Sequence, residues 1–157
     1  MSKDPDFYSP EIQKSARQGG YKYAEIWQSV DKCPFCDLKE KYIVTQDNDV
    51  VLTANLFPYV DYHLLIIPRK HVLLLSELSE NDWLAVRRLA ELGRKLLEAV
   101  TNNDAYTFVL REGNNKKKTV QHLHFHLIPF HPDLESWQYQ KINVLPQEAA
   151  EEFRDAL

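Results

Sequence analysis

Three histidines alternate with apolar residues in one short stretch of the chain. They are His122, His124 and His126, and they make up half of the six histidines in the sequence. A β-strand over residues 122–128 would place the three imidazoles on one face and bury the apolar residues between them on the other, because successive side chains of a strand point to opposite faces. Imidazole has a pKa near neutrality, so such a row can supply a nucleophile, a proton donor or a metal ligand. The pattern therefore predicts a chemical site.

Two kinds of chemistry fit this histidine row. One is a metalloenzyme site in which two or three of the imidazoles bind an ion, although no acidic residue follows the row closely enough to add a carboxylate. The other uses the central His124 as a nucleophile that attacks phosphorus and forms a covalent nucleotidyl-histidine, which water or a second acceptor then opens. In that case the flanking groups would hold the phosphoryl oxygens and offset the charge of the leaving phosphates.

The composition is that of one ordinary globular domain. The chain has 157 residues, of which 44% are hydrophobic and 27% charged, with a formal net charge of −4. This charge argues against a general nucleic-acid partner, and no apolar run approaches the length of a membrane span. Residues 1–6 lack the apolar core of a signal peptide, so the expected compartment is the cytoplasm.

A second candidate site is the pair Cys33 and Cys36. Two thiolates make only half of a tetrahedral zinc shell, so the spacing alone also allows a redox pair or two buried thiols. A redox pair normally follows a strand and opens a helix in a βαβ unit, and this region shows no such pattern.

The elements that must position these residues form an α+β pattern. Apolar runs predict about five antiparallel strands, over residues 42–46, 50–54, 63–67, 106–110 and 122–128. Ser79 is the expected N-cap of one long helix that packs on the sheet, and Pro146 opens a short C-terminal helix. Residues 1–20 are polar and read as an N-terminal extension, which leaves residues 21–157 as a single domain.

Three separated motifs carry a resemblance to a known family. The first is the histidine row followed by Pro129, and the second, over residues 55–71, has Asn55, then Pro58, then a histidine-led apolar strand and Pro-x-x-His. The third is the cysteine pair. In their order from about residue 33 to 131, these motifs resemble those of the histidine triad (HIT) family. The residues of the motifs are most similar to those of its zinc-containing diadenosine polyphosphate hydrolase and phosphorylase branch.

The resemblance implies a HIT-like fold and an enzyme, a nucleotide hydrolase or nucleotidyltransferase. Its expected target is a phosphoanhydride or related bond, most simply in a dinucleoside polyphosphate. His124 would be the nucleophile, with His126 and nearby backbone holding the α-phosphate. Asn55 falls where the family binds ribose hydroxyls. His63 falls near the same pocket, and for His63 a purely structural role fits the sequence about as well as a binding role.

The resemblance also implies a structural zinc ion and a homodimer. The zinc ligands would be Cys33, Cys36, His71 and His122. Two other functions stay open, a nucleotide-binding regulatory protein without turnover and a metalloenzyme with its ion on the histidine triad.

Three positions depart from the family pattern. Lys118 stands where a glutamine usually touches a phosphate in the family. We expect Lys118 and Thr119 to bind the nucleotide. The alternative is that the lysines of residues 116–118 simply form the solvated tip of a hairpin. Tyr62 replaces a glycine before the strand-initial histidine. Arg111 replaces a residue that often contacts nucleotide in relatives.

Overall fold

A computed structural model describes residues 33–113, 120–132 and 142–157 of the chain. Its five antiparallel strands form one sheet in the order β1-β2-β3-β5-β4. The strands are β1 (Ile43–Asp47), β2 (Val50–Ala54), β3 (Leu64–Pro68), β4 (Tyr106–Leu110) and β5 (Phe125–Pro129). The helices are the 3-10 turns η2 (Glu40–Tyr42) and η3 (Leu75–Glu77), the long helix α3 (Glu80–Thr101) and the short helix α4 (Pro146–Asp155). No helix in these ranges is both long and apolar enough to cross a membrane.

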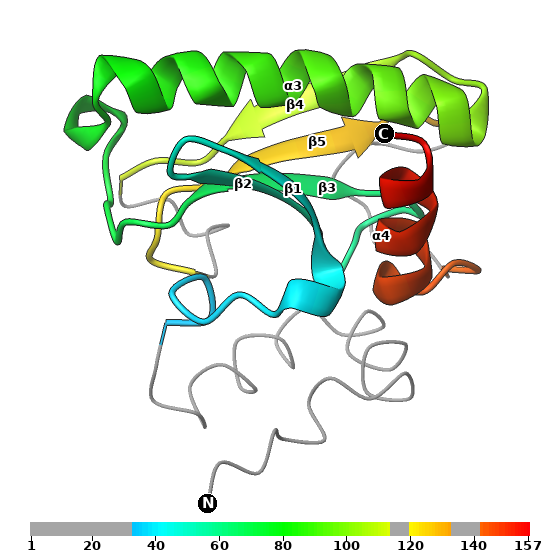
Figure 1. Cartoon of the computed structure of the whole chain (residues 1–157), viewed down its shortest axis with the longest axis horizontal. Helices are drawn as coiled ribbons and strands as arrows, with labels where there is room; N and C mark the ends of the chain where they lie inside the picture. The colour runs from blue at the N-terminus through cyan, green and yellow to red at the C-terminus, as the bar shows by residue number, and fades with distance from the viewer. Residues whose placement is uncertain (1–32, 114–119, 133–141) are drawn as a thin grey trace, which may run out of the picture.

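The predicted α+β fold is confirmed, including the long helix and the short C-terminal helix. Figure 1 shows α3 lying along one face of the sheet and α4 at the end of the sheet near the start of β1. The proposed extension over residues 1–20 lies outside the described residues, so the single domain over residues 21–157 stays a prediction.

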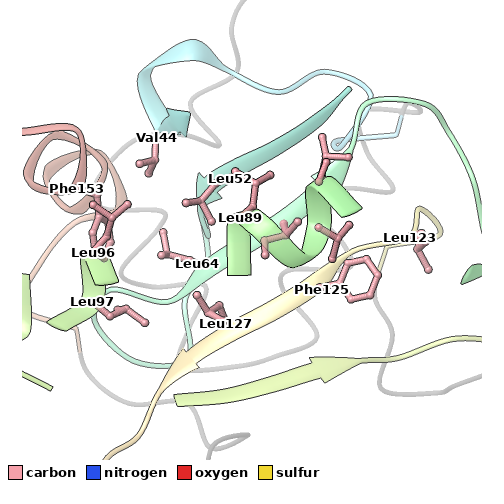
Figure 2. Packing of buried hydrophobic residues seen from close by; sticks show 14 of the residues in the cluster. Val44, Leu52, Leu64, Leu89, Leu96, Leu97, Leu123, Phe125, Leu127 and Phe153 are labelled. Carbon is pink, nitrogen blue, oxygen red and sulfur yellow. The ribbon is translucent and has the colours of Figure 1, made fainter. Parts of the chain in front are cut away.

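The long helix begins and ends where its capping residues require. The Ser79 hydroxyl accepts a hydrogen bond from the Asp82 amide at 3.1 Å, as expected of an N-cap. At the other end Asn102 takes a left-handed conformation with φ of 56° and its amide bonds to the carbonyl of Glu98. Between these caps, one face of α3 packs on the main hydrophobic core, which Figure 2 shows between helix and sheet. The buried residues of this face are Ala85, Val86, Leu89, Gly93, Leu96 and Leu97.

A glycine lets α3 approach the sheet closely. A methyl group added at Gly93 would collide with the side chain of Leu127 on β5, and it would also lie 3.7 Å from Leu64 on β3. The absence of a side chain at this position therefore sets the distance between the helix and the two central strands.

The fifth strand is shorter than the sequence predicted. β5 begins at Phe125, so only His126 of the histidine row lies within a strand. The neighbouring strand β4 ends at Leu110, opposite Phe125, and the amide of Leu123 bonds instead to the carbonyl of Val72 at 2.7 Å. The side chains still alternate as predicted, since the three histidines lie on one side and Leu123 reaches the core on the other.

The turn before β3 holds a residue in an unusual conformation. Tyr62 has φ of 65°, which explains why glycine suits this position in the family. Here the Tyr62 ring packs edge-on against Phe153, and its hydroxyl bonds to Glu152 at 3.1 Å. Burial and the nearby carboxylates raise the pKa of Tyr62 to about 12. Contacts with α4 thus offset the strain of a left-handed tyrosine.

Filling the space at Gly93 should force the helix and sheet apart. We expect Gly93→Val to lower the free energy of unfolding by about 1–3 kcal/mol, the usual cost of overpacking a core. The control is Ala99→Val, because Ala99 is exposed on the same helix and this change costs only helix propensity, below about 1 kcal/mol. Urea unfolding of both variants measures the difference, and equal stabilities would contradict the close approach.

Candidate active site and metal centre

The histidines gather on the face of the sheet opposite α3. A second, smaller hydrophobic cluster covers this face, and it comprises Phe35, Phe57, Leu65, Ile67 and Val120. His63, His122, His124 and His126 are all buried beside it. The sheet therefore separates a hydrophobic core on one side from a buried polar site on the other.

His124 has a defined orientation and tautomer. Its Nδ1 lies 2.7 Å from the backbone carbonyl of His122, which can only accept, so Nδ1 carries the proton and Nε2 carries the lone pair. The ring packs edge-on against Phe35, at 4.8 Å between centroids, and against His126 at 4.9 Å. These contacts hold the Nε2 lone pair of His124 in a fixed place.

His122 faces a different group. Its Nε2 donates to the carbonyl of Pro68 at 2.7 Å, which leaves the Nδ1 lone pair directed at the cysteine pair. Nδ1 lies 3.4 Å from the sulfur of Cys33 and 3.5 Å from that of Cys36. The Cys36 sulfur is in turn 3.2 Å from Nδ1 of His71.

These four side chains fit a tetrahedral metal ion. The ligand atoms of Cys33, Cys36, His71 and His122 all lie within 4.8 Å of one another. Zinc bond lengths and tetrahedral angles require a sulfur-to-nitrogen separation of about 3.5 Å, and the separations given above agree with it. Among the described residues, this is the cluster of histidine, cysteine and acidic side chains that suits a metal, and His124 and His126 are not part of it.

The two thiols of this cluster disfavour each other's ionisation. Desolvation and the neighbouring Cys33 sulfur raise the pKa of Cys36 to about 11. Two adjacent thiols resist ionisation by themselves, whereas a bound metal ion deprotonates its thiol ligands.

His126 belongs to a hydrogen-bonded row of polar groups. Its Nδ1 lies 2.9 Å from Nε2 of His63. The Nδ1 of His63 accepts from the backbone amide of Tyr59 at 3.0 Å and lies 3.3 Å from the side-chain nitrogen of Asn55. The oxygen of the Asn55 amide accepts from the backbone of Phe57 at 3.0 Å, which fixes the orientation of that amide.

The other end of this row meets Arg111, which follows β4. The Arg111 NH1 lies 3.1 Å from Nε2 of His126 and donates to the hydroxyl of Tyr59 at 3.0 Å. The Tyr59 ring is stacked on His126 and lies under the guanidinium, 5.6 Å from its carbon. Tyr59 and Arg111 thus form one wall of the site.

The electrostatics of this site keep His126 neutral. Burial lowers the pKa of His126 well below its usual range, and the rings of His63 and His124 and the charge of Arg111 lower it further. The site therefore presents the neutral imidazole of His126 beside the permanent positive charge of Arg111.

The structure brings most of the expected site residues together. His124, His126, His63 and Asn55 meet in one site, and the four expected metal ligands form another beside it; Lys118 and Thr119 lie outside the described residues. The sequence did not single out Phe35, Tyr59 or Arg111 as part of the site. Arg111 carried a signal, as a departure from the family pattern. Phe35 and Tyr59 did not, because contacts between rings follow no spacing rule in a sequence.

Comparison with known proteins agrees with the geometry. The family model of the HIT domain matches residues 38–133, more than half of the chain. Adenosine 5'-monophosphoramidase HINT3 of Danio rerio is 32% identical over 129 residues, which cover 78% of this chain and 81% of that protein. A bis(5'-adenosyl)-triphosphatase of Dictyostelium discoideum is 32% identical over 80 residues, covering 48% of this chain and 51% of that protein.

A solved structure supports the same fold. A zinc-bound histidine triad family protein from Mycobacterium smegmatis superposes with a TM-score of 0.66 at 18% identity, covering 80% of this chain and 92% of that one. The fold and the family expected from the motifs are confirmed, and the named relatives are enzymes that act on adenosine nucleotides. The chain belongs to the HIT domain family.

Proposed function

We propose that this protein is a nucleotide hydrolase or nucleotidyltransferase that works through a covalent nucleotidyl-His124 intermediate. The observation that carries the proposal is the 2.7 Å hydrogen bond from Nδ1 of His124 to the carbonyl of His122, which puts the lone pair on Nε2. The two relatives with named activities support the substrate class, since one is a monophosphoramidase and the other a triphosphatase of adenosine nucleotides. The expected bond is a phosphoanhydride or a related bond of a nucleotide, such as a dinucleoside polyphosphate.

The proposed reaction has two displacements at one phosphorus. The Nε2 lone pair of His124 forms a bond to the α-phosphorus, and the bond to the leaving group breaks with its electrons on the leaving group. The ring then carries a positive charge, which the carbonyl of His122 stabilises through the Nδ1 proton. Water or another acceptor next attacks the same phosphorus, the bond to Nε2 breaks with its electron pair on Nε2, and the acceptor loses its proton to solvent, which restores neutral His124.

The remaining expected residues take binding roles in this proposal. His126 lies beside His124 and would hold an oxygen of the α-phosphate. Asn55 uses one N–H and one lone pair in its contacts with His63 and Phe57, which leaves one of each for ribose hydroxyls. The nucleotide contacts of Lys118 and Thr119 and the cytoplasmic location remain predictions.

We also propose that Cys33, Cys36, His71 and His122 bind one zinc ion. Two thiolates and two imidazoles favour zinc, and four protein ligands leave no open position for substrate, so the ion would be structural.

Two alternative functions of the protein are less favoured. An ion on the triad itself would need two or three of its imidazoles to converge, yet His122 turns toward the cysteines and, among the described residues, the cluster that suits a metal includes neither His124 nor His126. A regulator without turnover keeps the same pocket, and only activity separates it from an enzyme.

The nucleophile can be tested by substitution. His124→Ala should lower turnover of a dinucleoside polyphosphate by at least about a thousandfold while nucleotide affinity stays within a few-fold, because a nucleophile acts mainly in the transition state. His131→Ala is the control, since His131 is an exposed histidine on the same segment and should leave turnover unchanged. Retention of more than about a tenth of the wild-type rate by His124→Ala would exclude this mechanism. Nucleotide binding without any turnover in the wild type would favour the regulator.

The metal can be tested by analysis and melting. Purified protein should hold about one zinc ion per chain, and the double variant Cys33→Ser, Cys36→Ser should hold none. Removing zinc should lower Tm by at least about 5 °C, because the ion links the cysteine turn to His71 and His122. A metal-free protein with an unchanged melting curve would remove zinc from the account.

A homodimer is the expected assembly, and we propose that it forms along β4. This strand is one edge of the sheet. Two large apolar side chains are exposed there: Phe108 on β4 is 41% exposed, and Phe130, just after β5, is 50% exposed. Sedimentation should give twice the 18.4 kDa chain mass, and Phe130→Glu should shift the protein toward the monomer. Leu157→Glu, at the exposed end of the chain after α4, is the control and should stay dimeric. A wild-type monomer would contradict the proposal.

A further inference from the structure

Four polar groups stand in a row that ends at the surface of the site. The Tyr59 amide meets Nδ1 of His63 at 3.0 Å, Nε2 of His63 meets Nδ1 of His126 at 2.9 Å, and Nε2 of His126 meets NH1 of Arg111 at 3.1 Å. The row thus has two imidazoles in the middle and a nitrogen donor at each end.

The protons of this row do not match its contacts. A backbone amide and a guanidinium can only donate, and each neutral imidazole carries one N–H. The amide, the two rings and the guanidinium together bring four protons to three contacts, and a hydrogen bond uses one. One contact must therefore hold two N–H groups that face each other, and protonating either ring would only add to the surplus.

The surrounding contacts locate this surplus. At the inner end, the buried Asn55 side chain directs its N–H at the same Nδ1 of His63 that accepts from the Tyr59 amide. Nδ1 of His63 must then carry the lone pair, which puts a proton on its Nε2 and, in turn, on Nε2 of His126. The two facing donors are Nε2 of His126 and NH1 of Arg111. Arg111 is only half-buried, and its side chain can adjust while the amide of Tyr59 cannot.

We propose that Arg111 and Nε2 of His126 together bind an anionic phosphate oxygen of the substrate, and that Arg111 selects phosphoanhydrides over phosphoramidates. The inference rests on the proposed function and names its substrate class. An oxygen between the two nitrogens accepts from both and resolves the proton mismatch. Water could also accept both protons, but the guanidinium charge favours an anion.

The preference for anhydrides follows from what a guanidinium can and cannot do. In an anhydride the bond from phosphorus to the bridging oxygen breaks and its electron pair stays on a phosphate anion, which needs no proton and is stabilised by a fixed positive charge. In a phosphoramidate the leaving nitrogen must gain a proton to depart as an amine. Arginine has no proton to give near neutral pH, because its pKa exceeds about 12.

The test compares two substrates in matched variants. We expect Arg111→Gln to lower kcat/KM for diadenosine tetraphosphate by at least about a hundredfold and that for adenosine 5'-phosphoramidate by no more than about tenfold, the loss expected from the α-phosphate that both substrates share. Arg111→Lys should recover part of the loss because it keeps the charge. Arg87→Gln is the control, since Arg87 is exposed on α3, where it pairs with Glu91. Equal losses on the two substrates, or none, would overturn the selectivity.

Two measurements keep the proposal separate from the proposed function. Calorimetry should show that Arg111→Gln weakens AMP by about tenfold and leaves adenosine unchanged. Nitrogen NMR of the wild type should show the proton of His126 on Nε2. A proton on Nδ1 would overturn the inference, because Arg111 would then simply donate to His126. If neither substrate is turned over, the proposed function fails, and the comparison of AMP with adenosine still decides whether Arg111 binds phosphate.

Discussion

The hydrogen bond from Nδ1 of His124 to the carbonyl of His122 is the contact on which the site depends. It determines which nitrogen of His124 carries the lone pair, and it ties the ring to a backbone segment that is itself held from two directions. The His122 side chain turns toward the cysteines and also donates to Pro68 at the end of β3. Phe35, which lies between the two cysteines in sequence, packs against the His124 ring. The Cys33, Cys36, His71 and His122 cluster and His124 therefore share one segment of backbone, so loss of the proposed zinc ion should disturb the place of His124.

The sheet makes this arrangement possible by keeping its two faces chemically different. Toward α3 the central strands offer leucine, isoleucine and phenylalanine, and Gly93 lets the helix come close enough to close that core. Toward the other face the same strands place His126 opposite Leu65, beside His63 at the start of β3. Burial on this face raises the strength of every polar contact and the cost of leaving one unmade. That is why the surplus proton between His126 and Arg111 has a consequence for ligand binding.

Much of this could be predicted from the sequence, because periodicity and capping are local. The alternation of His122 to Leu127, the cap at Ser79 and the turn residues before β2 each predict an element that the structure confirms, and the HIT family motifs predict which histidines meet. The start of β5 was wrong, since strand ends depend on where neighbouring strands stop, and β4 stops at Leu110. Tyr59 and Arg111 were missed as a pair because they are 52 residues apart and meet only through the fold. The left-handed Tyr62 is explained by α4, which the local sequence does not reveal.

The measurement that tests the central claim most directly is the stereochemical course of the reaction at phosphorus. A dinucleoside polyphosphate whose attacked phosphorus is made stereogenic with sulfur, hydrolysed in isotope-labelled water, reports the number of displacements. Each in-line displacement inverts the phosphorus, so attack by His124 followed by attack of water gives overall retention of configuration. Overall inversion would show that water attacks the substrate directly and would contradict a nucleotidyl-His124 intermediate.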